Sequence, residues 1–405
     1  MKKVPKLRFK EFEKEWEEKK IGDITNLTAG GTPNTLKKEY WNGNIKWMNS
    51  GELNLKFIYD VQGRITELGL KNSSTKLIPE KCILIGLAGQ GKTRGTVAIN
   101  FIELCTNQSI ASIFPNFNYF KPMFLYYNLD NRYEELRNLS TGSNGRGGLN
   151  LNILKRISVF FPILKEQEKI ADFLSSVDVK INLTENKLEL LKEYKKGIMQ
   201  KIFNQELRFK DSNGNDYPEW EEKKLGDITK FSKGKLISKE DITDTGVECI
   251  RYGELYTTYN EVINKVVSKT NLDISTLVLS EKNDIIIPCS GETAIDIAKA
   301  SCVTKSGVAL GGDLNILKLN ENGIFLSYYL NNKAKYQIVS LAQGASVVHL
   351  YEDHLKKLKI KVPILQEQQK IADFLSAIDS KIEKISDELE NLKEFKKGLF
   401  QQMFV

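Results

Sequence analysis

The sequence predicts an α+β protein. Two globular mixed α/β domains are joined by two long antiparallel helices that form a coiled coil, with an internal pseudo-twofold repeat. The chain has 405 residues, more than a single hydrophobic core usually accommodates. Two segments recur about 200 residues further along, and one of them carries a heptad pattern of apolar residues. The rest of each half alternates β-rich apolar runs with glycine-rich polar loops.

Two pairs of matched strings carry the repeat. The string EWEEKKIGDIT at 15–25 returns almost unchanged at 219–229, and PILKEQEKIADFLS at 162–175 returns at 363–376. A period this long lies far beyond that of stacked solenoid repeats, so it indicates a duplicated domain. The globular stretches between the strings differ widely from one half to the other. We therefore expect four segments: 1–160, 161–205, 206–361 and 362–405.

Each half ends in a predicted long helix. Pro162 is followed by acidic residues, as is typical of a helix N-terminus. An apolar seam with alternating steps of four and three follows, and a helix over 166–203 would be about 57 Å long at roughly 1.5 Å per residue. Antiparallel pairing of the two helices is the simplest way to bury both seams. Lys195 and Lys396 hold equivalent seam positions, where they either snorkel or fix the register.

The globular halves combine predicted strands and helices. Helical patterns cover 121–138 and 326–341. Apolar β-rich runs lie at 82–85, 96–99, 284–287 and 315–317.

Composition excludes several classes of protein. No apolar run is long enough to span a bilayer, and the charged first 20 residues do not form a secretory signal. The five cysteines are scattered without a CxxC pair, so we expect neither a metal centre nor a redox site, and a cytoplasmic location. His349 and His354 lack a clear third ligand, and we interpret them as surface or DNA-proximal residues. The net charge of +7 permits a polyanionic partner without requiring one.

One motif suggests a nucleotide-binding enzyme. Gly86–Thr93 matches the pattern of a P-loop and follows a strand-like run. A P-loop must open into a helix, whereas the residues after Arg94 have the composition of another strand. A polar, basic loop between two strands suits contact with DNA better, but the P-loop enzyme stays as an alternative.

At this point the chain resembles a known family, the specificity (S) subunits of type I restriction-modification systems. The string at 162–174 and its copy at 363–375 are similar to the conserved regions of that family. The segments between them resemble two different types of target recognition domain. The first type is matched by Gly30–Pro33, Tyr40–Trp47 and Thr106–Ile110, and the second by Gly234–Ser238, Arg251–Tyr256, Ser290–Thr293 and Gly311–Asn315.

The resemblance implies a non-catalytic subunit that binds double-stranded DNA. Each target recognition domain would bind one half of a bipartite site through the major groove, and the helices would set the spacer. Two modification subunits would bind along the helices and methylate adenine with S-adenosylmethionine. Restriction subunits would join them and use ATP and Mg²⁺, so we expect no cofactor on this chain. The charged helix faces, such as Lys187, Glu189, Lys192 and Glu193, would meet the modification subunits.

Loop placement and side-chain chemistry suggest which residues contact DNA. Cations bind phosphates or guanine edges, and amides pair with adenine. In the first half we select Gln90, Lys92, Arg94, Asn144 and Arg146; in the second half we select Lys233, Lys235, Arg251, Ser290, Thr293 and Lys305. A second alternative remains at this stage, a scaffold protein whose contact with DNA is incidental.

The heptad helices generate a first prediction. Inserting one helical turn, about four residues, into both helices should lengthen the unread spacer of the DNA target. The methylated adenines in the host genome, mapped by single-molecule sequencing, would reveal the spacer. A spacer of unchanged length would contradict the idea that the helices act as a ruler.

Overall fold

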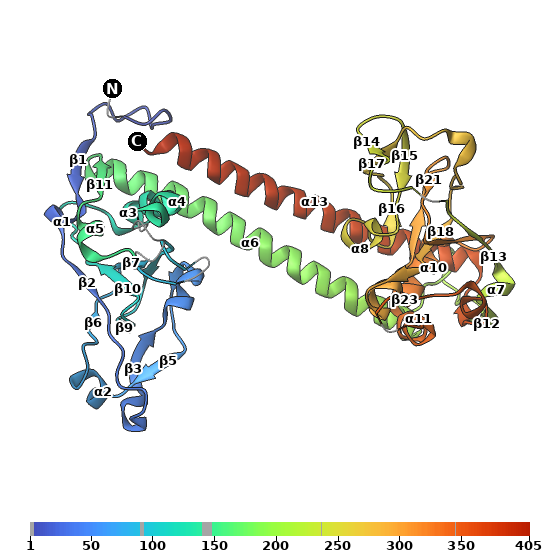
Figure 1. The fold of residues 1–405 in the computed structure, drawn as a ribbon, viewed down its shortest axis with the longest axis horizontal. Coiled ribbons are helices and arrows are strands. Elements are labelled where there is room, and N and C mark those ends of the chain that lie inside the picture. Colours follow the sequence, from blue (N-terminus) through green and yellow to red (C-terminus); the bar gives the residue numbers. More distant parts are fainter. Residues whose placement is uncertain (1–3, 90–92, 140–147, 236, 345) are drawn as a thin grey trace. The chain divides into compact units, whose positions relative to one another are not determined.

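The computed structural model describes residues 4–89, 93–139, 148–235, 237–344 and 346–405 (Figure 1). The chain divides into two compact units. Unit 1 contains Met1–Glu185 together with Glu388–Val405, and unit 2 contains Asn186–Asp387. Each unit therefore combines one globular domain with parts of both long helices.

The domain of unit 1 packs two sheets against each other. A mixed core of apolar side chains, including Met48, Leu84, Ala98 and Ile110, fills the space between them. The first sheet has the order β2 (Leu27–Ala29), β10 (Ile110–Ile113), β7 (Ile83–Gly86), β8 (Val97–Asn100) and β4 (Phe57–Ile58). The second has the order β5 (Gly63–Ile65), β3 (Trp41–Met48), β9 (Leu104–Thr106) and β6 (Leu77–Ile78).

Helices cover the opposite face of the five-stranded sheet. Helix α3 (Pro122–Asp130) contacts β7 and β8, and β7 is buried on both faces, which explains its continuous apolar sequence. The predicted helix over 121–138 is divided into α3 and α4 (Tyr133–Asn138), because Arg132 leaves the helical region and donates a hydrogen bond to the carbonyl of Ser158. The remaining short elements are β1 (Glu17–Lys20), α1 (Ile21–Ile24), η1 (Lys38–Tyr40), η2 (Ser50–Leu55), α2 (Glu67–Lys71), α5 (Leu151–Lys155) and β11 (Ser158–Phe161).

Unit 2 repeats the strand order of the five-stranded sheet with other residues, whereas its second sheet is arranged differently. Its five-stranded sheet has the order β13 (Thr229–Lys233), β22 (Leu314–Leu319), β18 (Ile285–Pro288), β20 (Ser301–Val303) and β16 (Val262–Ile263), and its second sheet has the order β14 (Ile242–Thr243), β17 (Ser268–Thr270), β15 (Val247–Ile250) and β21 (Ala309–Leu310). Alternate side chains of β18 enter two cores. Ile286 faces the second sheet, whereas Ile285 and Ile287 belong to the core that contains residues of α10 (Gly323–Asn332).

Short elements complete unit 2. The predicted helix over 326–341 is again divided, here into α10 and α11 (Lys335–Leu341). The others are β12 (Glu221–Lys224), α7 (Leu225–Ile228), α8 (Glu254–Thr257), η3 (Ile274–Thr276), β19 (Ser290–Gly291), α9 (Ala294–Ile297), β23 (Val348–His349), α12 (Glu352–Leu355) and β24 (Lys359–Val362). The strands predicted from the sequence are confirmed in both units, within one or two residues at their ends.

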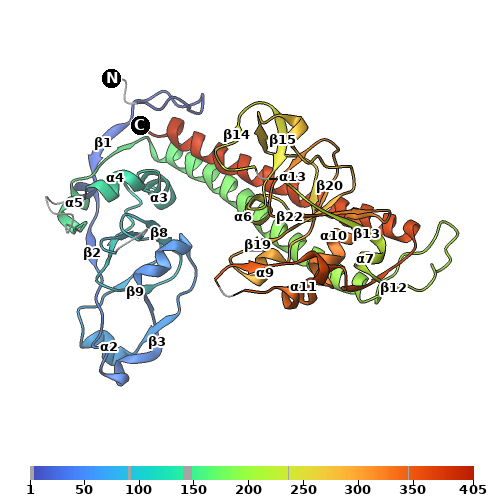
Figure 2. The same cartoon turned by 45° about the vertical axis from the view of Figure 1, so that its right-hand side comes forward.

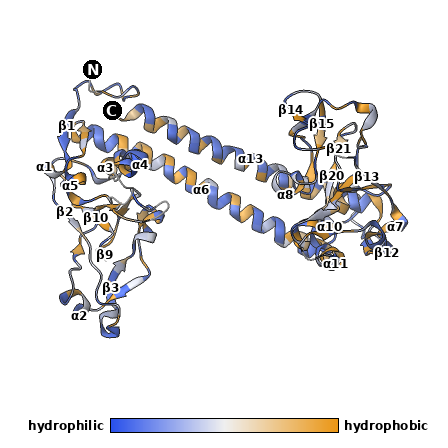
Figure 3. Cartoon of the chain, viewed as in Figure 1, coloured by the Kyte–Doolittle hydropathy of each residue, from blue (hydrophilic) through white to orange (hydrophobic). Residues whose placement is uncertain are grey.

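The two long helices are also confirmed. Helix α6 spans Leu164–Phe203 and α13 spans Leu365–Met403. Figure 3 shows hydrophilic and hydrophobic residues alternating along both helices, as amphipathic helices require. Seam residues such as Ile170, Leu174 and Thr184 are buried.

The helices pair antiparallel within each unit (Figures 1 and 2). In unit 1, Lys180 of α6 forms an ion pair with Glu388 of α13 at 2.8 Å. Two further residues of the same helices, Asp178 and Lys396, pair at 2.6 Å. As the residue number increases along α6, that of the partner on α13 decreases, so the two helices are antiparallel, as predicted.

In the first turn of each long helix, a buried glutamate binds an arginine from a distant segment of the chain. Glu166 is 1% exposed and accepts two hydrogen bonds from the guanidinium group of Arg8, at 2.7 and 2.8 Å. Its counterpart Glu367 is fully buried and binds Arg208 in the same two-pronged way. The arginines stand in Leu-Arg-Phe strings at 7–9 and 207–209, a further repeat that our sequence analysis did not single out.

The glutamine that follows each glutamate ties the helix to its domain. Gln167 accepts a hydrogen bond from the backbone amide of Lys121 at 2.9 Å, directly before α3. Gln368 accepts the equivalent bond from Asn322 at 2.9 Å, directly before α10. The Glu-Gln pair thus explains why this part of the string returns unchanged.

These contacts generate a stability prediction. Arg208→Met should lower the free energy of unfolding by about 3–5 kcal/mol, because it leaves the buried carboxylate of Glu367 without its partner. Urea denaturation followed by circular dichroism would measure the loss. Lys210→Met is the matched control, since its ion pair with Asp216 is 62% and 79% exposed and should contribute less than about 1 kcal/mol. Equal losses in the two variants would contradict the assignment.

Candidate nucleic-acid interface

The loops at one edge of the five-stranded sheet of unit 1 lie together. Strands β2 and β7 run toward this edge, and β10 and β8, antiparallel to their neighbours, start from it. Three polar segments meet there: the loop after Ala29, the loop 107–109 before β10, and the described residues between β7 and β8, 87–89 and 93–96. We call this the unit 1 edge.

Hydrogen bonds hold the unit 1 edge together. Thr32 donates to the Oε1 atom of Gln108 at 2.5 Å, and the amide of Leu87 donates to the carbonyl of Ser109 at 2.8 Å. A Cβ atom at Gly30 would lie only 2.1 Å from the carbonyl oxygen of Thr106, so the close approach of the two loops requires glycine there. Two motifs that the resemblance singled out, at 30–33 and 106–110, are thus in contact.

The nucleotide-binding interpretation of Gly86–Thr93 is wrong. Strands β7 and β8 pair antiparallel, with Ile83 opposite Ile99. The amide of Gly95 donates to the carbonyl of Gly86 at 2.9 Å, which continues the antiparallel pairing beyond the ends of the two strands. A phosphate-binding P-loop opens into a helix instead, so that its backbone amides converge on the ligand.

The sites selected in the first half lie mostly beyond the described residues. Gln90, Lys92, Asn144 and Arg146 fall outside the described ranges, and only Arg94 is placed, shortly before β8. The flanks of the two loops are nevertheless adjacent. A Cβ atom on Gly148 would lie 3.2 Å from the carbonyl oxygen of Leu87.

Unit 2 has an equivalent edge with different side chains. Strands β13 and β18 end at it and β22 begins there, with Lys233 opposite Asn315. Lys235 bridges to Gly311, whose amide donates to the carbonyl of Ile250, the residue before Arg251. We call this the unit 2 edge, and it unites four of the residues selected from the sequence: Lys233, Lys235, Arg251 and Ser290.

The side chains of the unit 2 edge suit an anionic ligand. Lys233 and Lys235 are exposed, and Arg251 is half-buried with an Nε atom that has no hydrogen-bond partner. Beside Arg251, the ring of Tyr252 packs edge-on against Tyr256 at 6.2 Å. Cations that alternate with aromatic rings are typical of surfaces that bind nucleic acid.

Two selected residues occupy other settings. Thr293 caps α9, where its hydroxyl accepts a hydrogen bond from the amide of Asp296 at 3.2 Å. Lys305 follows the far end of β20, at the opposite end of the sheet from Lys233, and pairs with Glu248 at 3.1 Å. The structure therefore does not bring Lys305 to the unit 2 edge.

The structure adds an aromatic cluster that our selection omitted. Strand β23 pairs with β19 so that His349 lies opposite Ser290, on the unit 2 edge. The ring of His349 stacks on Tyr351 at 6.1 Å, and His354 meets Tyr351 edge-on at 5.8 Å. The proximity of the only two histidines was the available signal, but the pairing with Ser290 spans almost 60 residues of sequence.

Other chemistry is not represented in the described part of the chain. There, no group of three or more His, Cys, Asp or Glu residues could hold a metal ion, and no helix is long and apolar enough to cross a membrane. Burial raises the pKa of the Cys82 and Cys302 thiols to about 12, so both remain protonated and unreactive at neutral pH.

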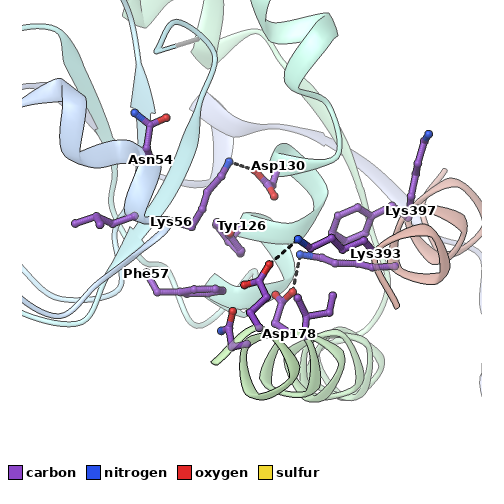
Figure 4. Close-up of a pocket in the computed structure, with 14 residues that line it drawn as sticks. Asn54, Lys56, Phe57, Tyr126, Asp130, Asp178, Lys393 and Lys397 are labelled. Carbon is purple, nitrogen blue, oxygen red and sulfur yellow. Dashed lines mark hydrogen bonds and ion pairs between the residues drawn. The ribbon is translucent and has the colours of Figure 1, made fainter. Parts of the chain in front are cut away.

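A cavity of about 570 Å³ in unit 1 lies where the domain meets the helices (Figure 4). Its charged residues are paired. Lys56 binds Asp130 at 2.7 Å, and Lys396 binds Asp178 at 2.6 Å. Because the cations are neutralised within the chain, we interpret the cavity as a joint between domain and helices.

Comparisons with known proteins agree with the duplication. The family model of the type I restriction modification DNA specificity domain matches residues 13–193 and again 217–394. The MjaIX specificity subunit of a type I restriction enzyme from Methanocaldococcus jannaschii is 28% identical over 401 residues, which cover 95% of this chain and 90% of that protein. The MjaVIII specificity subunit from the same organism is 24% identical, with coverage of 95% and 91%. The crystal structure of a type I S subunit from M. genitalium has the same fold, with a TM-score of 0.64, 19% identity and 99% coverage of both chains.

Proposed function

Because this chain belongs to the type I restriction-modification DNA specificity family, we propose that it selects the DNA sequence on which partner enzymes act. Each unit binds one half of a bipartite site in double-stranded DNA, and the chain itself is non-catalytic. The observation that carries this proposal is the equivalence of the two edges. Both stand on five-stranded sheets with the same strand order, yet their side chains differ.

The chemistry of the edges supports different half-sites. Lys233, Lys235 and Arg251 supply cations, which bind phosphates and the O6 and N7 atoms of guanine. The described part of the unit 1 edge offers, beside Arg94, amide and hydroxyl groups such as Gln108 and Thr32, which suit adenine and other hydrogen-bonding edges.

The long helices provide surfaces for partners. We propose that two modification subunits bind along them and that restriction subunits join this assembly. On the part of α6 in unit 1, Val179 and Leu183 lie about one turn apart and are 57% and 61% exposed, which supports docking of a protein. S-adenosylmethionine, ATP and Mg²⁺ would then be bound by the partners.

An exchange of one domain tests the proposal against the scaffold alternative. Replacing residues 25–160 with the corresponding domain of a relative should change one half of the methylated target and leave the other half unchanged. Single-molecule sequencing of DNA from cells that contain the assembled complex would identify both halves. If the target stays the same, the domain does not select DNA and the scaffold interpretation is correct.

Single substitutions on the unit 2 edge test the residues. Arg251→Ala should weaken binding of the cognate site by about 1–3 kcal/mol and relax one target position. Lys233→Ala and Lys235→Ala should weaken binding to all sequences and reduce the salt dependence by about one charge each. Fluorescence anisotropy at several salt concentrations would measure these effects.

Lys305→Ala is the matched comparison for these lysines. Its position at the opposite end of the sheet, in an ion pair with Glu248, leads us to expect little change in affinity. If Lys305→Ala lowered the affinity as much as Lys233→Ala, DNA would contact both ends of the sheet. That result would contradict the assignment of the unit 2 edge.

A further inference from the structure

A buried aspartate in unit 1 joins three separate elements. Asp178 of α6 is 8% exposed and accepts a hydrogen bond from the hydroxyl of Tyr127 in α3 at 2.9 Å. The same carboxylate pairs with the ammonium group of Lys396 in α13 at 2.6 Å. We call Tyr127, Asp178 and Lys396 the unit 1 triad; it connects the recognition domain, the first part of α6 and the last part of α13.

Unit 2 contains the equivalent arrangement. Asp379 of α13 accepts a hydrogen bond from the hydroxyl of Tyr328 in α10 at 2.5 Å and pairs with Lys195 of α6 at 2.7 Å. We call Tyr328, Asp379 and Lys195 the unit 2 triad. In each triad the lysine also lies over the tyrosine ring, at 5.8 Å in unit 1 and 5.1 Å in unit 2.

The triads differ from the other ion pairs between the helices. Lys180 and Glu388 are 57% and 45% exposed, and Lys393 and Glu185 are 52% and 42% exposed. Solvent screens such pairs, which contribute little to stability. The triad lysines are only 14% and 21% exposed and occupy seam positions. Apolar side chains there would tolerate a shift along the helix, but a poorly hydrated charge must meet its partner.

We infer that the two triads are positioning residues, which hold each recognition domain in one orientation on its helices and so fix the spacer length that the protein accepts in DNA. This inference rests on the proposed function. A tilt of the domain on its helix would move the loops of its edge along the duplex, where one base pair corresponds to about 3.4 Å.

The two triads are not identical. Lys195 has a second carboxylate partner, Glu261, at 3.0 Å, directly before β16 of the recognition domain. Burial disfavours the charged form of Lys195, but Glu261 and Asp379 outweigh it and raise the lysine pKa above its ordinary value. Removing this lysine leaves two carboxylates unpaired, so Lys195→Met should lower the melting temperature more than Lys396→Met.

A set of variants separates positioning from folding. Lys396→Met leaves Asp178 without its cation and should lower the melting temperature by several degrees. Adding Asp178→Asn removes the unpaired buried charge. The double variant Lys396→Met/Asp178→Asn should therefore regain most of the melting temperature that Lys396→Met loses. Neither variant contains the ionic contact between α6 and α13. Lys396→Arg keeps it and should resemble the wild type, and Lys393→Met, which breaks only an exposed pair, is the control.

The measurement is binding of the full chain to duplexes that carry the mapped target with its natural spacer or with one base pair added or removed. We expect the wild type, Lys396→Arg and Lys393→Met to prefer the natural spacer. The double variant should remain stable, but its affinity ratio between the natural and the altered spacers should be about tenfold smaller than that of the wild type. This loss matches the coupling expected for charged residues in contact.

Each outcome decides between interpretations. A stable double variant with wild-type spacer preference would overturn the inference and leave the triads a purely structural role. Wild-type protein that binds the mapped target no better than unrelated DNA would instead overturn the proposed function, and the inference with it.

Discussion

Four carboxylates, three of them buried and the fourth, Asp379, partly exposed, determine how each domain is attached to its helices. Glu166 and Asp178 lie on α6, and Glu367 and Asp379 lie at the equivalent positions of α13. A carboxylate loses its hydration on burial, and this cost is offset only when a cation and hydrogen-bond donors meet it in good geometry. The glutamates take their cations from the chain segment that enters the domain, and the aspartates take theirs from the other helix. The local arrangement of chain entry, domain and helices in each unit therefore depends on these pairs.

This constraint explains the uneven similarity of the two halves. A substitution at a helix position that holds a buried charge requires a matching change in a distant segment, so helix and entry strings correspond closely in both halves. The edges are subject to no such requirement. Their loops need only the close backbone approaches that Gly30 and Gly234 permit, where an added Cβ would lie 2.1 and 2.0 Å from a carbonyl oxygen. Different loops can thus be carried on one frame, as recognition of different half-sites demands.

The sequence alone predicted the features that local periodicity encodes. The heptad seam, the duplication and the buried strands such as β7 and β18 were correct, because spacing along the chain specifies them. Contacts between distant segments were not accessible in the same way. The strand order, the pairing of His349 with Ser290 and the position of Lys305 away from the unit 2 edge all depend on sheet register, which no short string reveals. The P-loop alternative was already disfavoured by the strand-like composition of residues 96–99, and β8, paired antiparallel with β7, confirms that a strand follows.

The two edges differ in a way that bears on how a split target is recognised. On the unit 2 edge, two exposed lysines flank Gly234, where two backbone segments approach each other closely. Cationic contacts bring affinity for any duplex, whereas neutral amides and hydroxyls discriminate between base edges. The described part of the unit 1 edge contains groups of the second kind, such as Gln108 and Thr32, together with Arg94. Among the selected residues that the structure describes, the cations therefore lie mainly on the unit 2 edge. Under the proposed function, both edges contribute to binding, so a selector of bipartite sites binds tightly only where both halves of the target are present.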